Sequence, residues 1–194
     1  MAVGNVNFPV MNPITGISLG TANAGIKQTV RADILVMQMA VGSSCAAVFT
    51  QNAFCAAPVH IARAHLSQSP RWLLINSGNA NAGTGKMGIT HALFTCETLA
   101  TLIEGKPEQV LPFSTGVIGE LLAVDKIEKA LPIAIAQLAE DNWATVQVPF
   151  SFFFILSFYL SSCHLFFLVL TSNLVFFFSK NIRLVWKENA LYKL

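Results

Sequence analysis

The sequence is poor in charged residues and has no marked excess of basic ones. Asp, Glu, Lys and Arg make up 11% of its 194 residues, and the formal net charge is +2. Residues 1–149 hold eight basic and nine acidic residues, whereas residues 150–194 hold four basic and one acidic. Neither piece has the strongly basic face of a nucleic-acid-binding protein. The charge pattern excludes that class and indicates a break in composition near residue 149.

The sequence also lacks the cysteine and histidine spacings of metal and redox sites. Its four cysteines form no C-x-x-C pair. His60 and His65 are five residues apart, which fits neither one face of a helix nor an H-E-x-x-H motif. No charged-then-apolar signal region and no Arg/Ser-rich transit segment precedes Lys27. We therefore expect reduced thiols, no metal and a cytoplasmic location.

Short apolar runs and amphipathic stretches alternate along the first three quarters of the chain. This alternation predicts an α/β or α+β domain. Gly42-Ser43-Ser44 predicts a hairpin turn between the second and third strands. The predicted strands are Ile17–Thr21, Ile34–Val41, Cys45–Thr50, Trp72–Ile75 and Val110–Phe113. The predicted helices are Val59–Leu66, Ile89–Ile103 and Val124–Leu138, the last split by Pro132.

A loop rich in Asn, Gly and Ala follows the apolar run Trp72–Ile75 and reaches Gly88. Its last part, Gly83–Gly88, matches G-x-G-x-x-G. In a dinucleotide-binding unit, however, the first Gly follows the strand directly, and a second strand ends in an acidic residue about twenty positions later. Neither condition is met, so we interpret these glycines as serving a tight backbone turn.

A second small-residue segment, Ser114-Thr115-Gly116, follows the predicted strand Val110–Phe113. A Thr hydroxyl beside a Gly amide can direct two hydrogen-bond donors at one oxygen. Such an arrangement stabilises the oxyanion formed during acyl transfer. The tripeptide alone is commonplace, and by itself it is better interpreted as an ordinary turn.

Several segments, in this order, resemble the ornithine acetyltransferase family, the bifunctional glutamate N-acetyltransferases of arginine biosynthesis. The resemblance covers residues 1 to about 145. Its segments are Gly16–Gly25 (GISLGTANAG), Ala47–Leu66 (AVFTQNAFCAAPVHIARAHL), Asn76–Gly85 (NSGNANAGTG), Glu108–Asp125 and Asp141-Asn142-Trp143.

The resemblance implies an α/β fold with an oxyanion hole at Thr115 and Gly116. It implies acetyl transfer from N-acetylornithine, or from acetyl-CoA as a substrate, to glutamate, without a bound cofactor. The family's precursor cleaves itself, and the new amino-terminal Thr of the second fragment is the nucleophile, activated by its own α-amine. The second fragment and further copies of the chain are therefore the expected partners of the intact enzyme. Nucleic acid is not expected, and a membrane is expected only if residues 149–194 are a genuine protein segment.

The resemblance stops after Trp143-Ala144-Thr145. The Thr-rich segment, binding Lys and self-cleaving Ala–Thr junction that should follow are missing. Instead, Phe150–Phe178 contains no charged residue and ten Phe. Three interpretations remain open: a transmembrane helix, translated noncoding DNA after a missed splice or frameshift, and a buried core segment.

We therefore predict two unlike regions. Residues 1–148 form the amino-terminal part of an α/β (α+β) ornithine acetyltransferase domain, and residues 149–194 form an unrelated hydrophobic tail. The chain lacks the nucleophile and is expected to be inactive by itself. The alternative is a non-enzymatic remnant tethered to a membrane through residues 150–178.

Overall fold

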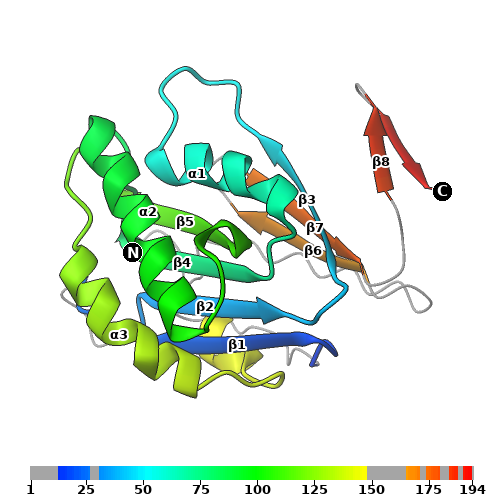
Figure 1. Cartoon of the computed structure of the whole chain (residues 1–194), viewed down its shortest axis with the longest axis horizontal. Helices are drawn as coiled ribbons and strands as arrows, with labels where there is room; N and C mark the ends of the chain where they lie inside the picture. Colours follow the sequence, from blue (N-terminus) through cyan, green and yellow to red (C-terminus); the bar gives the residue numbers. More distant parts are fainter. Residues whose placement is uncertain are drawn as a thin grey trace, which may run out of the picture.

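The computed structural model describes residues 13–26 and 31–147, together with the backbone of four later strands (Figure 1). The first part holds five strands and four α-helices. The strands are β1 Ile17–Ala22, β2 Ile34–Met39, β3 Ser44–Phe49, β4 Trp72–Asn79 and β5 Val110–Val117. The helices are α1 Ala57–His65, α2 Gly85–Leu102, α3 Val124–Ala136 and α4 Trp143–Gln147. The later strands are β6 Leu165–Leu170, β7 Leu174–Ser179, β8 Leu184–Lys187 and β9 Ala190–Lys193.

The central sheet has the strand order β1-β2-β4-β5. β2 runs antiparallel to both β1 and β4, whereas β4 and β5 are parallel. A parallel pair needs a crossover connection, and α2 supplies it between β4 and β5. The mixed α/β class predicted from the sequence is therefore present.

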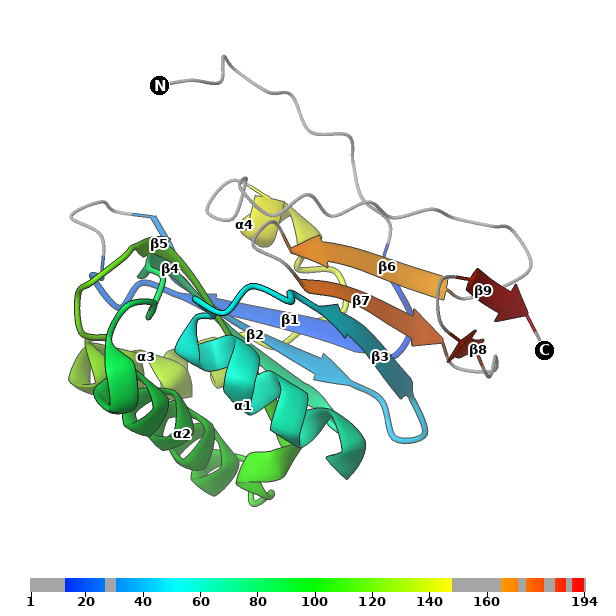
Figure 2. The ribbon, with the colours of Figure 1, turned by 90° about the horizontal axis from the view of Figure 1, so that it is seen from above.

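Two apolar layers enclose this sheet, because successive side chains of a strand point to opposite faces. Figure 2 shows α1, α2 and α3 on one side of the sheet and β3, β6, β7 and α4 on the other. On the helical side, Val36, Leu74 and Val110 pack with residues such as Leu99 and Leu131. On the opposite side the core residues include Leu19, Met37, Leu73, Leu111 and Trp143. The central strands are buried on both faces, which explains their nearly continuous apolar sequences.

The predicted hairpin between the second and third strands is wrong. A turn does form, since Ser43 N donates to Ala40 O at 3.2 Å. However, both edges of β2 are already occupied, by β1 and by β4. β3 therefore leaves the central sheet and pairs with β7 instead, in a second sheet of order β3-β7-β6.

Pro132 does not split the predicted helix, because α3 continues through it. A proline inside a helix removes one backbone hydrogen bond, here to the carbonyl of Glu128. Pro132 and Glu128 are both exposed, so water can hydrate that carbonyl. The buried residues Ile127, Leu131 and Ala134 keep the helix against the sheet.

The predicted transmembrane span at residues 150–178 lies largely outside the described residues. The parts that are described belong to β6 and β7, which are strands rather than a helix. Among the described residues, no helix combines the length and the apolar character needed to cross a membrane. The assignment of residues 149–194 as a separate region stays a prediction.

Candidate active site

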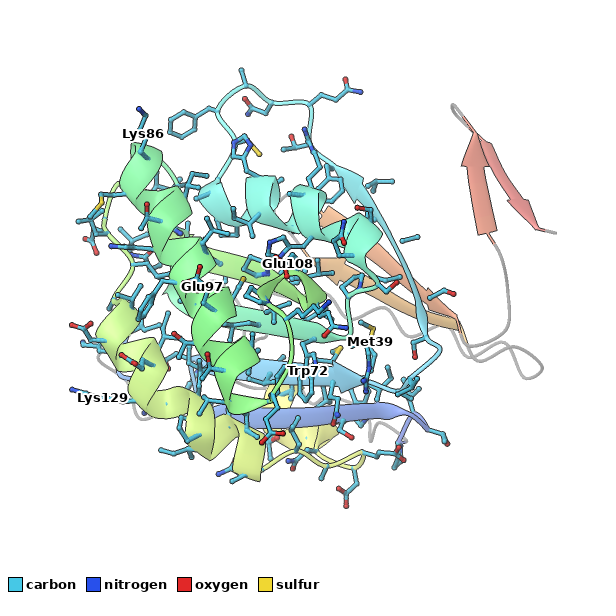
Figure 3. The ribbon with its side chains drawn as sticks, viewed as in Figure 1. Met39, Trp72, Lys86, Glu97, Glu108 and Lys129 are labelled. Atoms are coloured by element: carbon cyan, nitrogen blue, oxygen red, sulfur yellow. The ribbon has the colours of Figure 1, made fainter. Side chains whose placement is uncertain are left out.

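The two segments singled out in the sequence meet at the carboxyl ends of β4 and β5. Ser77 is the register partner of Thr115, and Gly78 is that of Gly116. Figure 3 labels Lys86, at the start of α2, near this edge of the sheet, whereas Met39 and Trp72 mark the opposite edge. In open α/β sheets, ligands bind beyond the carboxyl ends of the parallel strands. The fold therefore brings both segments to the edge where a site is expected.

Thr115 and Gly116 lie within β5 and not on a turn after it, which corrects the sequence prediction. β5 continues to Val117 and β4 to Asn79, so each strand is four residues longer than its apolar run. The polar ends remain strands because they pair with each other. Thr115 is half-buried and Gly116 is exposed, so a ligand can reach the pair.

Gly116 is required by the backbone at this point. Its φ is +138°, a conformation that side chains other than hydrogen rarely adopt. A Cβ there would overlap the backbone of Gly78 and Asn79. The parallel ladder also shifts register here, since Asn79 pairs with both Thr115 and Val117. Asn79 therefore pairs with the residues on both sides of Gly116, and these two pairings fix the backbone of Gly116.

The side chain of Thr115 belongs to the sheet face opposite the helices. Along β5 it has the same parity as Leu111 and Phe113, which pack in the core on that face. The buried side chain of Ser77 shares this face on β4. The hydroxyl of Thr115 is therefore directed away from α2, and a ligand that meets it must approach from the other side of the sheet.

Buried asparagines hold the loops that follow β4 and β5. The side chain of Asn79 is 4% exposed, and its Nδ2 donates to the carbonyl oxygens of Glu120 at 3.1 Å and Leu121 at 3.2 Å. Its Oδ1 accepts from Asn81 N at 2.7 Å. Asn81, fully buried with a φ of +47°, donates from Nδ2 to Gly88 O at 2.9 Å. These bonds satisfy polar groups that would otherwise be costly to bury.

The glycines of the Gly83–Gly88 segment have backbone roles of the kind expected. Gly83 and Gly85 have φ values of +71° and +58°. Gly85 begins α2, and Gly88 is packed so closely that a Cβ would overlap the side chain of Thr84. This segment therefore serves the turn from β4 into α2.

Asp33 fixes another loop at the same edge of the sheet. It precedes β2 and is 1% exposed. Its two carboxylate oxygens accept hydrogen bonds from Ala24 N and Ile26 N, each at 2.6 Å. Its carbonyl oxygen accepts from Ser77 N at 2.8 Å. Asp33 thus joins the loop after β1 to the end of β4 beside Thr115.

Exposed apolar side chains also gather here. A Cβ built on Gly83 would lie 3.3 Å from Phe54 Cζ and 3.5 Å from Ile118 Cγ2, so both side chains lie over that glycine. Phe54 is 66% and Ile118 63% exposed, and Val117 and Leu121 nearby in the chain are also exposed. The site edge therefore presents apolar surface next to its hydrogen-bond donors.

His65 and Cys96 contribute packing within the helical layer. His65 Nδ1 lies 2.8 Å from Val110 O, to which it donates, and Cys96 Sγ approaches the same oxygen at 3.9 Å. Burial, and then the charge of Glu97, raises the pKa of the Cys96 thiol to about 12. Cys45, Cys55 and Cys96 carry free thiols. In the part of the chain that the structure describes, no three His, Cys, Asp or Glu residues form a group able to hold a metal ion.

Sequence reasoning proposed Thr115 and Gly116, which stays a prediction. It did not single out Asp33 and Asn79, whose side chains hold the backbone of the neighbouring loops. A signal for Asn79 was present, because asparagines at positions 76, 79 and 81 follow closely on the apolar run Trp72–Ile75. An asparagine there favours bonds to nearby backbone. Which carbonyl groups it reaches depends on β5, which is more than thirty residues away.

The arrangement is that of an α/β protein in which β4 and β5 end side by side, at the edge where open α/β sheets generally bind their ligands. Comparison with known proteins then identifies its family. The ArgJ family model matches residues 18–148, and the chain belongs to this family.

Relatives and solved structures agree with this assignment. The arginine biosynthesis bifunctional protein ArgJ of Methylococcus capsulatus is 63% identical over 131 residues, which are 68% of this chain and 32% of that protein. The ArgJ of Pseudomonas syringae pv. tomato is 54% identical over 144 residues, or 74% of this chain and 36% of that protein. The chain thus spans about a third of the length of the curated relatives it matches.

The fold is similar to that of a crystal structure of ornithine acetyltransferase from Mycobacterium tuberculosis in complex with ornithine. The TM-score is 0.63 at 30% identity, over 68% of this chain and 71% of the solved one. An ArgJ structure from Bacillus halodurans gives a TM-score of 0.58 at 29% identity, over 65% of this chain and 73% of that one.

Proposed function

We propose that residues 18–148 supply the oxyanion hole of an ornithine acetyltransferase, which moves an acetyl group from N-acetylornithine to glutamate. One observation carries this proposal. Thr115 and Gly116, accessible and fixed in place, lie near the carboxyl end of the parallel strand β5, inside the region that matches the ArgJ family. The ornithine bound to the related M. tuberculosis enzyme supports an amino acid of this kind as ligand.

In the proposed reaction, a threonine hydroxyl from the second fragment attacks the acetyl carbonyl of N-acetylornithine. The carbonyl oxygen becomes an oxyanion, and the Thr115 hydroxyl and the Gly116 N–H donate hydrogen bonds to it. The C–N bond then breaks, ornithine leaves with a proton, and the acetyl group stays on the threonine as an ester. The amine of glutamate attacks this ester, which forms N-acetylglutamate and restores the hydroxyl. Acetyl-CoA is a second possible donor for the first step, and no bound cofactor is needed.

The nucleophile belongs to a second fragment that this chain does not contain. The match to the M. capsulatus protein and the match to the M. tuberculosis structure each cover 68% of this chain. The first makes up 32% of the M. capsulatus protein, whereas the second makes up 71% of the M. tuberculosis chain. That solved chain is therefore less than half as long as the curated relative, which supports a precursor cut into two chains. We expect the 194-residue chain alone to be inactive, and the complete enzyme to contain both fragments in a homo-oligomer.

The experiment that tests this function places residues 18–148 in a complete relative. They replace the matched residues of the M. capsulatus protein, and this grafted protein is incubated with N-acetylornithine and glutamate. We expect stoichiometric ornithine and N-acetylglutamate, and none from the 194-residue chain alone. A folded grafted protein that transfers no acetyl group would overturn the proposal. Transfer by the 194-residue chain itself would overturn the assignment of the nucleophile to another fragment.

A further inference from the structure

We infer that Asn79 is a positioning residue that fixes the Gly116 amide for oxyanion binding, an inference that rests on the proposed function. The hydrogen bonds on both sides of Thr115-Gly116 converge on β4. We call the set formed by Ser114, Asn76, Asn79 and the carbonyl groups of Glu120 and Leu121 the asparagine bracket.

The first half of the asparagine bracket holds the residue that precedes Thr115 and Gly116 in the chain. Ser114, the residue before Thr115, donates from Oγ to Asn76 Oδ1 at 2.5 Å. Asn76 Nδ2 in turn donates to Asn79 O at 2.9 Å. Asn76 and Asn79 are both 4% exposed, so these bonds form where water does not compete for the partners.

The second half of the asparagine bracket holds the segment that follows Gly116 in the chain. Asn79 Nδ2 donates to the carbonyl oxygens of Glu120 and Leu121, which are four and five residues beyond Gly116. Ala80 N donates to Val117 O at 2.8 Å, so the main chain next to Asn79 holds the same segment. The chain from 114 to 121 is thus tied to β4 before and after Gly116. Gly116 has no side chain of its own to anchor it, so its orientation depends on these ties together with its ladder pairing to Gly78.

Such anchoring matters because an oxyanion donor works only when it is aimed in advance at the developing charge. A small displacement of a positioned group lowers the rate of the chemical step without removing a group that reacts. The side chain of Asn79 uses both its donors and its acceptor on backbone groups, which leaves it no part in contacting substrate. Its proposed effect on the reaction is therefore indirect, through the position of the 116–121 segment that these bonds hold.

The direct test uses Asn79→Asp in the 194-residue chain. This change keeps the acceptor for Asn81 N but replaces the donor to the two carbonyl groups with an oxygen. The matched control is Asn52→Asp, the same change at an exposed asparagine whose oxygen accepts from Phe54 N. We expect amide hydrogen exchange in residues 116–121 to accelerate at least about tenfold in the Asn79 variant alone, with β2 unchanged. Unchanged exchange at 116–121, or equal acceleration throughout, would overturn the inference.

A second variant covers the case in which Asn79→Asp fails to fold. Replacing Leu121 with its α-hydroxy acid turns the 120–121 peptide bond into an ester, which weakens the Glu120 carbonyl as an acceptor and changes no side chain. Exchange at residues 116–119 should again accelerate locally. Exchange at the wild-type rate there would contradict the bracket.

The catalytic consequence is measured in the grafted protein, per active site titrated by its acetyl-enzyme burst. We expect Asn79→Asp to lower kcat about ten- to a hundredfold, with KM for both substrates unchanged. Combined with Thr115→Val, its effect should be less than multiplicative, because both changes damage one oxyanion hole. Multiplicative effects would overturn the positioning role. An inactive grafted protein without further substitutions would refute the proposed function instead. The hydrogen-exchange measurements on Asn79→Asp would then still test whether the asparagine bracket holds residues 116–121.

Discussion

Gly116 combines a positive φ with a contact that no residue bearing a Cβ can make. The positive φ alone costs an L-residue stability, and the overlap with Gly78 adds a steric cost. This residue shows how a small side chain allows β4 and β5 to approach at the site. Its role in the sheet can be separated from its role in catalysis by measuring stability alone.

We predict that Gly116→Ala lowers the free energy of unfolding by about 2–4 kcal/mol, as strain and overlap add. Gly119→Ala is the matched control, because Gly119 also has a positive φ (+85°) but has nothing within 4 Å of an added Cβ. It should cost about 1 kcal/mol. Urea unfolding of the two variants measures the difference, and equal losses would show that the contact with Gly78 contributes nothing.

At the residue scale, sequence reasoning proposed Thr115 and Gly116 as donors but did not identify the residues that hold the backbone around them. Thr115 and Gly116 stood out through their chemistry and through a resemblance covering the segment around them. Asp33 and Asn79 did not, because each acts on backbone groups that the fold brings near. A single sequence shows that an asparagine is present, and only the fold shows which carbonyl groups it meets.

At the scale of helices and strands, apolar periodicity located each main element between residues 17 and 136. The errors have separate physical causes. The ends of β4 and β5 were missed because Asn, Ser and Gly have low strand propensity, which the parallel ladder overrides. The hairpin was wrong because β2 has no free edge. Pro132 was misjudged because its exposed position makes the lost hydrogen bond tolerable.

The helical layer gives a pH-dependent prediction at Cys96, on the buried face of α2. Burial, and then the charge of Glu97, raises the pKa of its thiol from about 9 to about 12 on folding. Burying the neutral Cys96 thiol therefore contributes fully to the free energy of unfolding below about pH 9. This contribution declines as pH rises from there towards 12. We expect the urea midpoint to fall as pH rises from about 9 towards 12, and to fall less in Cys96→Ala. An equal decline in both proteins would contradict this.

At the scale of the whole molecule, residues 149–194 join the rest of the structure through the pairing of β7 with β3. Among the described strands, β3 pairs with β7 alone. β1, β2, β4 and β5 pair only with one another and belong to the family-matching region. The described strands of the central sheet therefore form their ladder hydrogen bonds without the tail, whereas β3 forms its ladder with β7 of the tail.

Truncation after residue 148 tests whether the two predicted regions are separable. We predict that amides of β2 and β4 stay protected from hydrogen exchange in the shortened chain, whereas those of β3 lose protection with β7. The 194-residue chain is the control. Loss of protection throughout the central sheet would show that residues 149–194 are part of the same folding unit.

The central claim is that this chain carries an oxyanion hole at Thr115 and Gly116, and Thr115→Val in the grafted protein tests it most directly. Valine preserves the shape and strand preference of threonine but removes the hydroxyl donor. We predict that kcat for acetyl transfer from N-acetylornithine to glutamate falls about 10²- to 10³-fold, with KM unchanged. Full activity in the folded variant would contradict the claim.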